Sequence, residues 1–65
     1  MNRLRHTREM RKLNQRQLSE LSHTPQALVS AIERGVLKPW PKVVTRFSEV
    51  LGIPADELFP DDFNK

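Results

Sequence analysis

The two histidines are the side chains of this 65-residue chain that first suggest catalysis or metal binding. Ser22 and His23 are neighbours, and His6 lies far from them in the sequence. A Ser–His pair catalyses hydrolysis only when a third group orients the imidazole and a pocket excludes water, and the sequence indicates neither. Two histidines without paired spacing, in a chain without cysteine, do not predict a metal site. The sequence therefore gives no basis for an enzyme, a metal centre or a cofactor.

The basic residues indicate a different chemistry, the binding of a polyanion. Residues 1–46 contain ten Lys or Arg against three Glu, a net charge of +7, whereas residues 47–65 contain Lys65 and five acids, a net charge of −4. Lys and Arg placed on phosphates release condensed counterions, which favours nucleic acid as a partner. A solvated charged face followed by an acidic tail explains the same composition, so charge alone leaves both interpretations open.

Length and composition narrow the class of protein. A chain this short forms one domain that buries only about 60% of its unfolded surface, which leaves little room for an enclosed active site. The absence of cysteine is typical of a reducing compartment. The charged N-terminal segment precedes no apolar stretch, and no apolar run approaches the roughly 20 residues of a membrane span. We therefore expect a soluble, unprocessed, cytoplasmic protein without a membrane partner.

The spacing of apolar residues predicts helices and no strand. The fold class expected is all-α, a compact bundle of five short helices. Residues 1–59 then form one domain, and residues 60–65 form a short acidic tail that frays. The five helices are expected at about residues 2–12, 15–22, 25–34, 41–51 and 54–59.

Capping residues define the second and third helices best. Asn14 and Gln17 form a capping-box pair at the start of the second helix. Thr24 is a good N-cap for the third helix, and Gly35 is a typical stop. His23 lies in the turn between them, where a left-handed backbone is expected. Two short helices joined by such a turn are typical of a helix-turn-helix, in which the second helix docks in the DNA major groove. An ordinary pair of antiparallel helices gives the same pattern, and the pattern alone favours the DNA-binding version only slightly.

The sequence resembles a known family over residues 4–59. The most specific part is the 18-residue span from Leu18 to Gly35. This span and the other matches resemble the phage-repressor and Cro type helix-turn-helix domains, also called the xenobiotic-response-element family. The resemblance implies a lambda-repressor-like fold and a repressor-like, sequence-specific regulator that binds double-stranded DNA, of bacterial or phage origin. It also favours a homodimer on a palindromic operator, with the third helix in the major groove. The matching residues are Leu4, Arg8, Leu13, Gln15, Leu18, Glu20, Val29, Ile32, Glu33, Gly35, Pro39, Val44, Phe47, Leu51, Gly52 and Asp56 to Phe59.

The resemblance also assigns roles on the third helix. Its base-reading positions fall on Gln26, Ala27, Leu28 and Ala31, and Ser30 faces outward beside them. Gln26 has the reach to bind adenine, while the apolar side chains suit thymine methyl groups. Leu28 fits equally well at the edge of the core.

Other matching positions imply contacts with phosphates or a structural role. Gln15 matches the phosphate-contacting glutamine of the family, and Asn14 beside it either shares that role or acts only as a cap, the favoured interpretation. Arg8 and Glu33 match a partly buried, structural ion pair. The remaining expected phosphate contacts are Arg34, Lys38 and Lys42.

The loop after the third helix departs from the family pattern. Many relatives have several basic residues there, whereas this chain has Val36, Leu37, Lys38 and then Trp40. The apolar residues of the loop suit a protein interface, and an antitoxin-like or anti-regulator interaction module with a protein partner at residues 36–40 is the alternative function. Trp40 could equally fold back onto the fourth helix and close the core.

Overall fold

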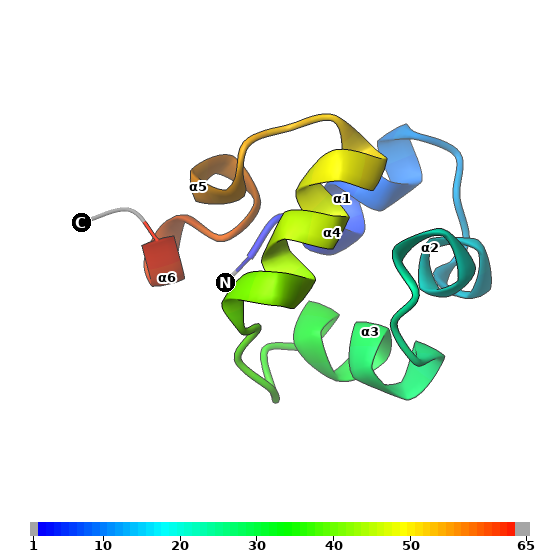
Figure 1. The fold of residues 1–65 in the computed structure, drawn as a ribbon, viewed down its shortest axis with the longest axis horizontal. Helices are drawn as coiled ribbons and strands as arrows, with labels where there is room; N and C mark the ends of the chain where they lie inside the picture. The colour runs from blue at the N-terminus through cyan, green and yellow to red at the C-terminus, as the bar shows by residue number, and fades with distance from the viewer. Residues whose placement is uncertain (1, 64–65) are drawn as a thin grey trace.

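The structure of this protein is a computed structural model that describes residues 2–63, and its secondary structure is entirely helical (Figure 1). No strand occurs within residues 2–63, so the predicted all-α fold class is confirmed. In Figure 1, α3 lies along the lower edge of the molecule, next to α2, while α5 and α6 lie at the end opposite α2. The helices are α1 (Leu4–Met10), α2 (Gln15–Ser22), α3 (Gln26–Glu33), α4 (Pro41–Leu51), α5 (Ala55–Leu58) and α6 (Pro60–Phe63).

Helix α1 is shorter than the predicted 2–12 because the residues on both sides of it adopt other conformations. The Asn2 side chain accepts a hydrogen bond from the Leu4 N–H (3.1 Å), and the Arg3 N–H donates to the Leu58 carbonyl (2.8 Å). Lys12 has a left-handed backbone, with φ of 62°. A left-handed residue cannot continue a right-handed helix, so α1 ends before it.

Helix α6 is an addition to the five predicted helices and lies within the segment that the sequence assigned to a tail. Pro60 suits the first position of a helix, where its missing N–H needs no partner. Asp61 follows it, and an acidic residue in a first turn interacts favourably with the helix dipole. Fraying of the tail beyond this turn lies outside the described residues.

The start of α2 agrees with the sequence prediction in detail. The Asn14 side chain accepts from the Gln17 N–H (2.7 Å), and the Gln17 side chain accepts from the Asn14 N–H (2.8 Å). These two bonds are the predicted capping box. Together they satisfy two of the N–H groups that a helix start leaves without partners.

The turn between α2 and α3 is built differently from the prediction in one respect. His23 has the expected left-handed backbone, with φ of 53° and ψ of 39°. Thr24 was expected to cap α3, but it is buried and its hydroxyl donates to the Ser22 carbonyl (3.1 Å). The first hydrogen bonds of α3 instead end on the Pro25 carbonyl. The prediction of Thr24 as the cap was therefore wrong.

The core brings apolar side chains from five of the helices and the loops together. In α2 the buried residues are Leu18 and Ser22, which are four positions apart and therefore share one face of the helix. Leu21 lies to the side of this face, toward solvent. The spacing of Leu18 and Leu21 predicts that both face the core, but Leu21 is 55% exposed, so this prediction was wrong for Leu21. The rings of Phe47 and Phe59 lie 6.4 Å apart at the centre of the core. The fully buried apolar residues are Leu4, Leu18, Val29, Ile32, Val43, Val44, Phe47, Leu51, Leu58 and Phe59.

Several helix ends are held by side chains that are distant in the sequence. The Asn2 amide donates to the Ile32 carbonyl at the end of α3 (2.7 Å), and the Arg11 guanidinium donates to the Leu51 carbonyl at the end of α4 (2.8 Å). The last carbonyls of a helix lack the usual partner four residues on. The Arg11 bond supplies a partner to the Leu51 carbonyl, and the Asn2 bond adds to the one that the Ile32 carbonyl accepts from the Gly35 N–H (3.1 Å). The carboxyl end of α3 is thereby attached to the start of the chain.

Candidate nucleic-acid interface

Helix α3 buries one side and exposes short side chains on the other. Val29 and Ile32 are fully buried, whereas Gln26 and Ala27 are exposed. The other predicted base-reading residues, Leu28, Ser30 and Ala31, are half-buried. A helix with such small outward side chains can lie deep in a groove, where methyl groups contact thymine and an amide reaches base edges.

Arg8 of α1 and Glu33 of α3 form a buried ion pair. The Arg8 Nε lies 2.6 Å from Glu33 Oε2, and its Nη2 donates to Glu33 Oε1 (3.2 Å). The third guanidinium nitrogen donates to the Leu13 carbonyl (2.8 Å), directly before α2. Only 9% of the Arg8 side chain and 3% of the Glu33 side chain are exposed. The pair therefore ties the start of α2 and the end of α3 to α1 through charge-assisted hydrogen bonds.

Gln15 belongs to the same network, which the sequence did not indicate. Its Nε2 donates to Glu33 Oε1 (3.0 Å), so one amide hydrogen is used within the protein. The second amide hydrogen and the backbone N–H in the first turn of α2 are the groups with which Gln15 can reach a phosphate. Asn14 uses its side-chain oxygen in the capping box, and its side-chain NH2 group is the one that can donate to a phosphate.

The expected cationic contacts flank α3 at its carboxyl end and beyond. Arg34, Lys38 and Lys42 are all exposed. The Arg34 Nε donates to the Ser30 carbonyl at 3.4 Å, a long contact that holds the guanidinium only weakly. Lys38 lines a hollow of about 340 Å³ that Asp61 also lines. Lys42 lies in the first turn of α4, where the helix dipole favours a bound anion.

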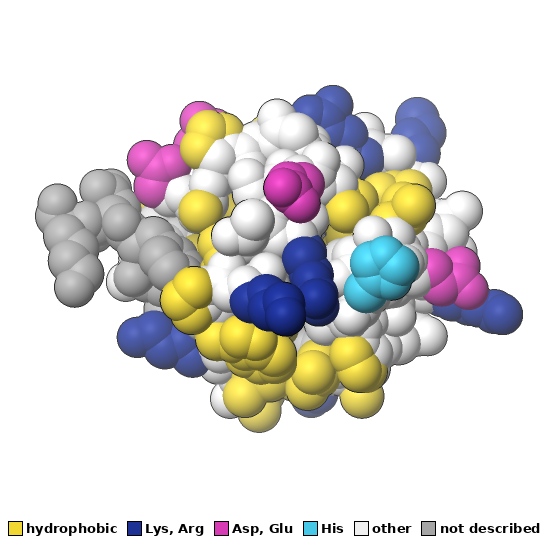
Figure 2. Space-filling model, viewed as in Figure 1, with side chains coloured by type: hydrophobic (Ala, Val, Ile, Leu, Met, Phe, Trp, Pro, Cys, Tyr) yellow, Lys and Arg dark blue, Asp and Glu magenta, His cyan; other side chains and the backbone are white. Residues whose placement is uncertain are grey.

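The three apolar loop residues do not share one environment. Val36 is 71% exposed and Trp40 41% exposed, whereas Leu37 is half-buried and packs against the core. The exposed apolar surface of the loop therefore consists of two residues and not of the three that the sequence suggested. In Figure 2, hydrophobic side chains gather along the edge of the molecule that carries α3 and the loop after it, beside Lys and Arg side chains.

A groove of about 880 Å³ lies beside α3 and opens between this helix, α1 and the start of α2. Its polar lining includes Gln15 and Arg34, two of the expected phosphate contacts, and also Arg5, which the sequence analysis did not single out. The spacing of Arg5 and Arg8 by three residues on α1 was the signal that could have found it, because such residues share a helix face.

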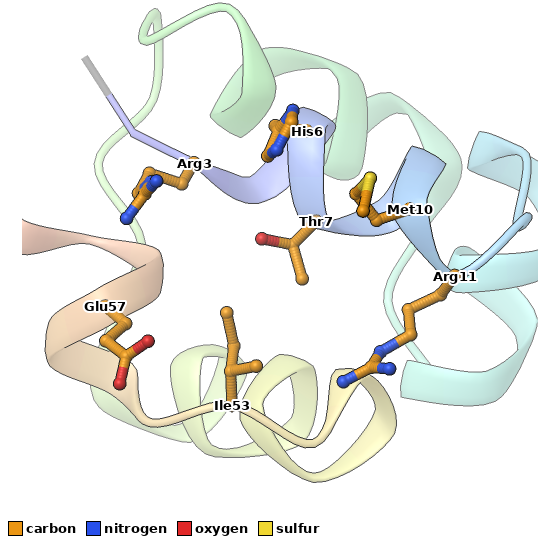
Figure 3. Close-up of a pocket in the computed structure, with 7 residues that line it drawn as sticks. All are labelled: Arg3, His6, Thr7, Met10, Arg11, Ile53 and Glu57. Carbon is orange, nitrogen blue, oxygen red and sulfur yellow. The ribbon is translucent and has the colours of Figure 1, made fainter.

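A second hollow, of about 260 Å³, lies on another side of α1 (Figure 3). Arg3 and Arg11 flank it, and Glu57 lies across it from His6. The hydroxyl of Ser22 is buried and donates to the Leu18 carbonyl (2.6 Å). Ser22 and His23 do not line this hollow, so the Ser–His neighbours and His6 do not meet there.

Comparison with known proteins agrees with this geometry. A family model described as helix-turn-helix matches residues 4–58, which include α1 to α5. No curated protein matched the chain. No helix within residues 2–63 has the length and apolar character needed to cross a membrane. The chain therefore belongs to the Cro/C1-type helix-turn-helix family, also called the xenobiotic-response-element family, whose domains bind DNA and regulate transcription.

Proposed function

We propose that this domain is a sequence-specific, repressor-like transcription regulator that inserts α3 into the major groove of double-stranded DNA. The observation that carries the proposal is the division of α3 into a fully buried side and an exposed side of short residues. Gln26 supplies hydrogen bonds to a base, and Ala27 and Ala31 supply contacts to thymine methyl groups. Ser30 and Leu28 contribute from the flanks of the same surface.

Residues suited to phosphate contacts lie on both sides of α3, and their positions support this orientation. Gln15 approaches one strand from the start of α2, with Asn14 beside it, and Arg34 lies at the end of α3. Lys38 and Lys42 contact phosphates from the loop and from α4. With few hydrogen-bonding side chains for base edges, DNA shape supplies a large part of the specificity.

The proposed regulator acts as a homodimer on a palindromic operator. One domain of this size offers few contacts, and joining two domains multiplies the affinity for a site with two halves. Half-sites about one helical turn apart present the same groove to both copies of α3.

The salt dependence of DNA binding tests the proposal. Three cationic contacts per protomer predict that the logarithm of the affinity falls with the logarithm of salt concentration, with a slope of about −5 for a dimer. This slope corresponds to an approximately thousandfold loss between about 50 and 200 mM salt. Duplexes that the protein binds are first selected from a pool of random sequences. The affinity for the selected duplex is then measured by fluorescence anisotropy at several salt concentrations. A selection that enriches no sequence, or a slope near zero, would exclude the proposed function.

The exposed loop favours one alternative function, an antitoxin-like or anti-regulator module that binds a protein. Val36 and Trp40 carry it, because both are exposed in the loop between α3 and α4. Rigid aromatic side chains of this kind are common anchors in protein interfaces. Leu37 contributes little surface because it packs against the core.

Two double variants separate these functions. The DNA-reading function predicts that Gln26→Ala with Arg34→Gln abolishes repression of a reporter that carries the selected sequence, whereas Val36→Ser with Trp40→Ser retains it. The protein-binding function predicts the reverse. If both double variants lose repression, the loop assembles the dimer that reads DNA. Analytical ultracentrifugation of the Val36→Ser, Trp40→Ser variant then checks whether it has become a monomer.

A further inference from the structure

The groove beside α3 connects two expected phosphate contacts that come from different helices. Gln15 at the start of α2 and Arg34 at the end of α3 both line this groove of about 880 Å³. A DNA strand that reaches both side chains must pass along the groove between them. The remaining wall is formed by α1, through Arg5 and its neighbours.

Two glutamates, Glu9 and Glu33, line the groove, and their negative charges are neutralised to different degrees. Both oxygens of Glu33 accept hydrogen bonds from Arg8, so this carboxylate is neutralised within the protein. Glu9 pairs with Arg5 at 3.3 Å, but their side chains are 55% and 72% exposed. An exposed pair at this spacing is weak, because water and salt screen both charges. The Arg5 guanidinium is therefore able to exchange this carboxylate for a phosphate.

We propose that the groove holds the sugar–phosphate backbone of one DNA strand, and that Arg5 is a further phosphate contact. The inference rests on the proposed function and adds α1 to the helices that touch DNA. Arg5 from α1 and Arg34 from the end of α3 then both contact the strand, while Gln15 contacts it from the start of α2. Glu9 opposes binding, because it both occupies Arg5 and repels the strand.

Variants of the exposed pair test the inference with matched controls. With Arg5 as a fourth cationic contact per protomer, the salt slope of the wild-type dimer becomes about −7. Arg5→Gln is expected to lower the affinity for the selected duplex and to return the slope to about −5, a change of about 1 per protomer. Glu9→Gln is expected to raise the affinity. The control Arg3→Gln removes the same charge beside the same helix, but Arg3 lines the other hollow, so its salt slope should stay close to that of the wild type.

The outcomes are distinguishable from failure of the proposed function. If wild-type protein binds with a steep salt slope but Arg5→Gln and Arg3→Gln behave alike, or Glu9→Gln weakens binding, the groove does not hold the strand and the proposed function stands. If wild-type protein lacks salt-dependent binding to any duplex, the proposed function itself fails. Because Arg5 and Glu9 are exposed, we expect the variants to have the same thermal unfolding midpoint as the wild type. Measuring this midpoint confirms that each variant is folded.

Discussion

Replacing Glu33 with alanine is expected to lower the free energy of unfolding by about 3–5 kcal/mol. The change leaves the Arg8 guanidinium, whose side chain is only 9% exposed, without its carboxylate partner. It also removes the acceptor of the Gln15 amide. A domain of this size has a total stability of about 3–10 kcal/mol, so much of the variant should be unfolded at room temperature. Urea denaturation followed by circular dichroism measures the loss.

Two further variants show whether the buried charge causes this loss. Glu9→Ala breaks the exposed pair with Arg5 and should cost less than about 1 kcal/mol. Arg8→Met combined with Glu33→Leu removes both charges and should recover much of the stability lost by Glu33→Ala, since apolar pairs often replace buried ion pairs without loss. Equal losses for Glu9→Ala and Glu33→Ala would contradict a special role for the buried pair.

Ala27→Glu is expected to lower the affinity for the selected duplex by about 100-fold or more. A carboxylate on the exposed side of α3 would face the DNA, and like charges brought together in an interface cost several kcal/mol, about tenfold in affinity for each 1.4 kcal/mol. Ala27 is exposed and lies in the first turn of α3, where an acidic residue is favourable for the helix. The variant should therefore fold at least as well as the wild type. Fluorescence anisotropy measures the affinity.

The control for this variant is Met10→Glu, which adds the same charge at an exposed position on α1. Met10 is 69% exposed and lines the hollow of Figure 3, which α3 does not line. Its effect on affinity should stay well below that of Ala27→Glu. An Ala27→Glu variant that binds like the wild type would show that the exposed side of α3 does not face the DNA.

Local signals in the sequence were sufficient to predict most of the helices. The Asn14 and Gln17 capping box depends on residues within one turn, and the structure contains both of its bonds. Gly35 and Gly52 end α3 and α4 with φ of 75° and 73°, a conformation that glycine adopts without steric cost. Pro41 begins α4, where its missing N–H has no consequence.

Features that depend on contacts between helices could not be predicted in the same way. The bond from Gln15 to Glu33 joins residues 18 positions apart, and it follows from how α2 and α3 pack against α1. The left-handed backbone of Lys12 has no glycine to signal it. Leu37 was grouped with the exposed loop residues because its packing against the core depends on the path of the loop. The roles of individual side chains on DNA remain predictions for the same reason.

The attachment of Asn2 to the end of α3 has a consequence for local opening of the fold. In an isolated helix the last turn frays at almost no cost, and its amide hydrogens exchange quickly with solvent. Here the Ile32 carbonyl is held by Asn2, and the next residue, Arg3, is itself bonded to Leu58. Fraying of α3 therefore requires the first residues of the chain to detach as well. We therefore expect α3 and the amino-terminal segment to open together, and a bound DNA that slows hydrogen exchange in α3 should slow it in that segment as well.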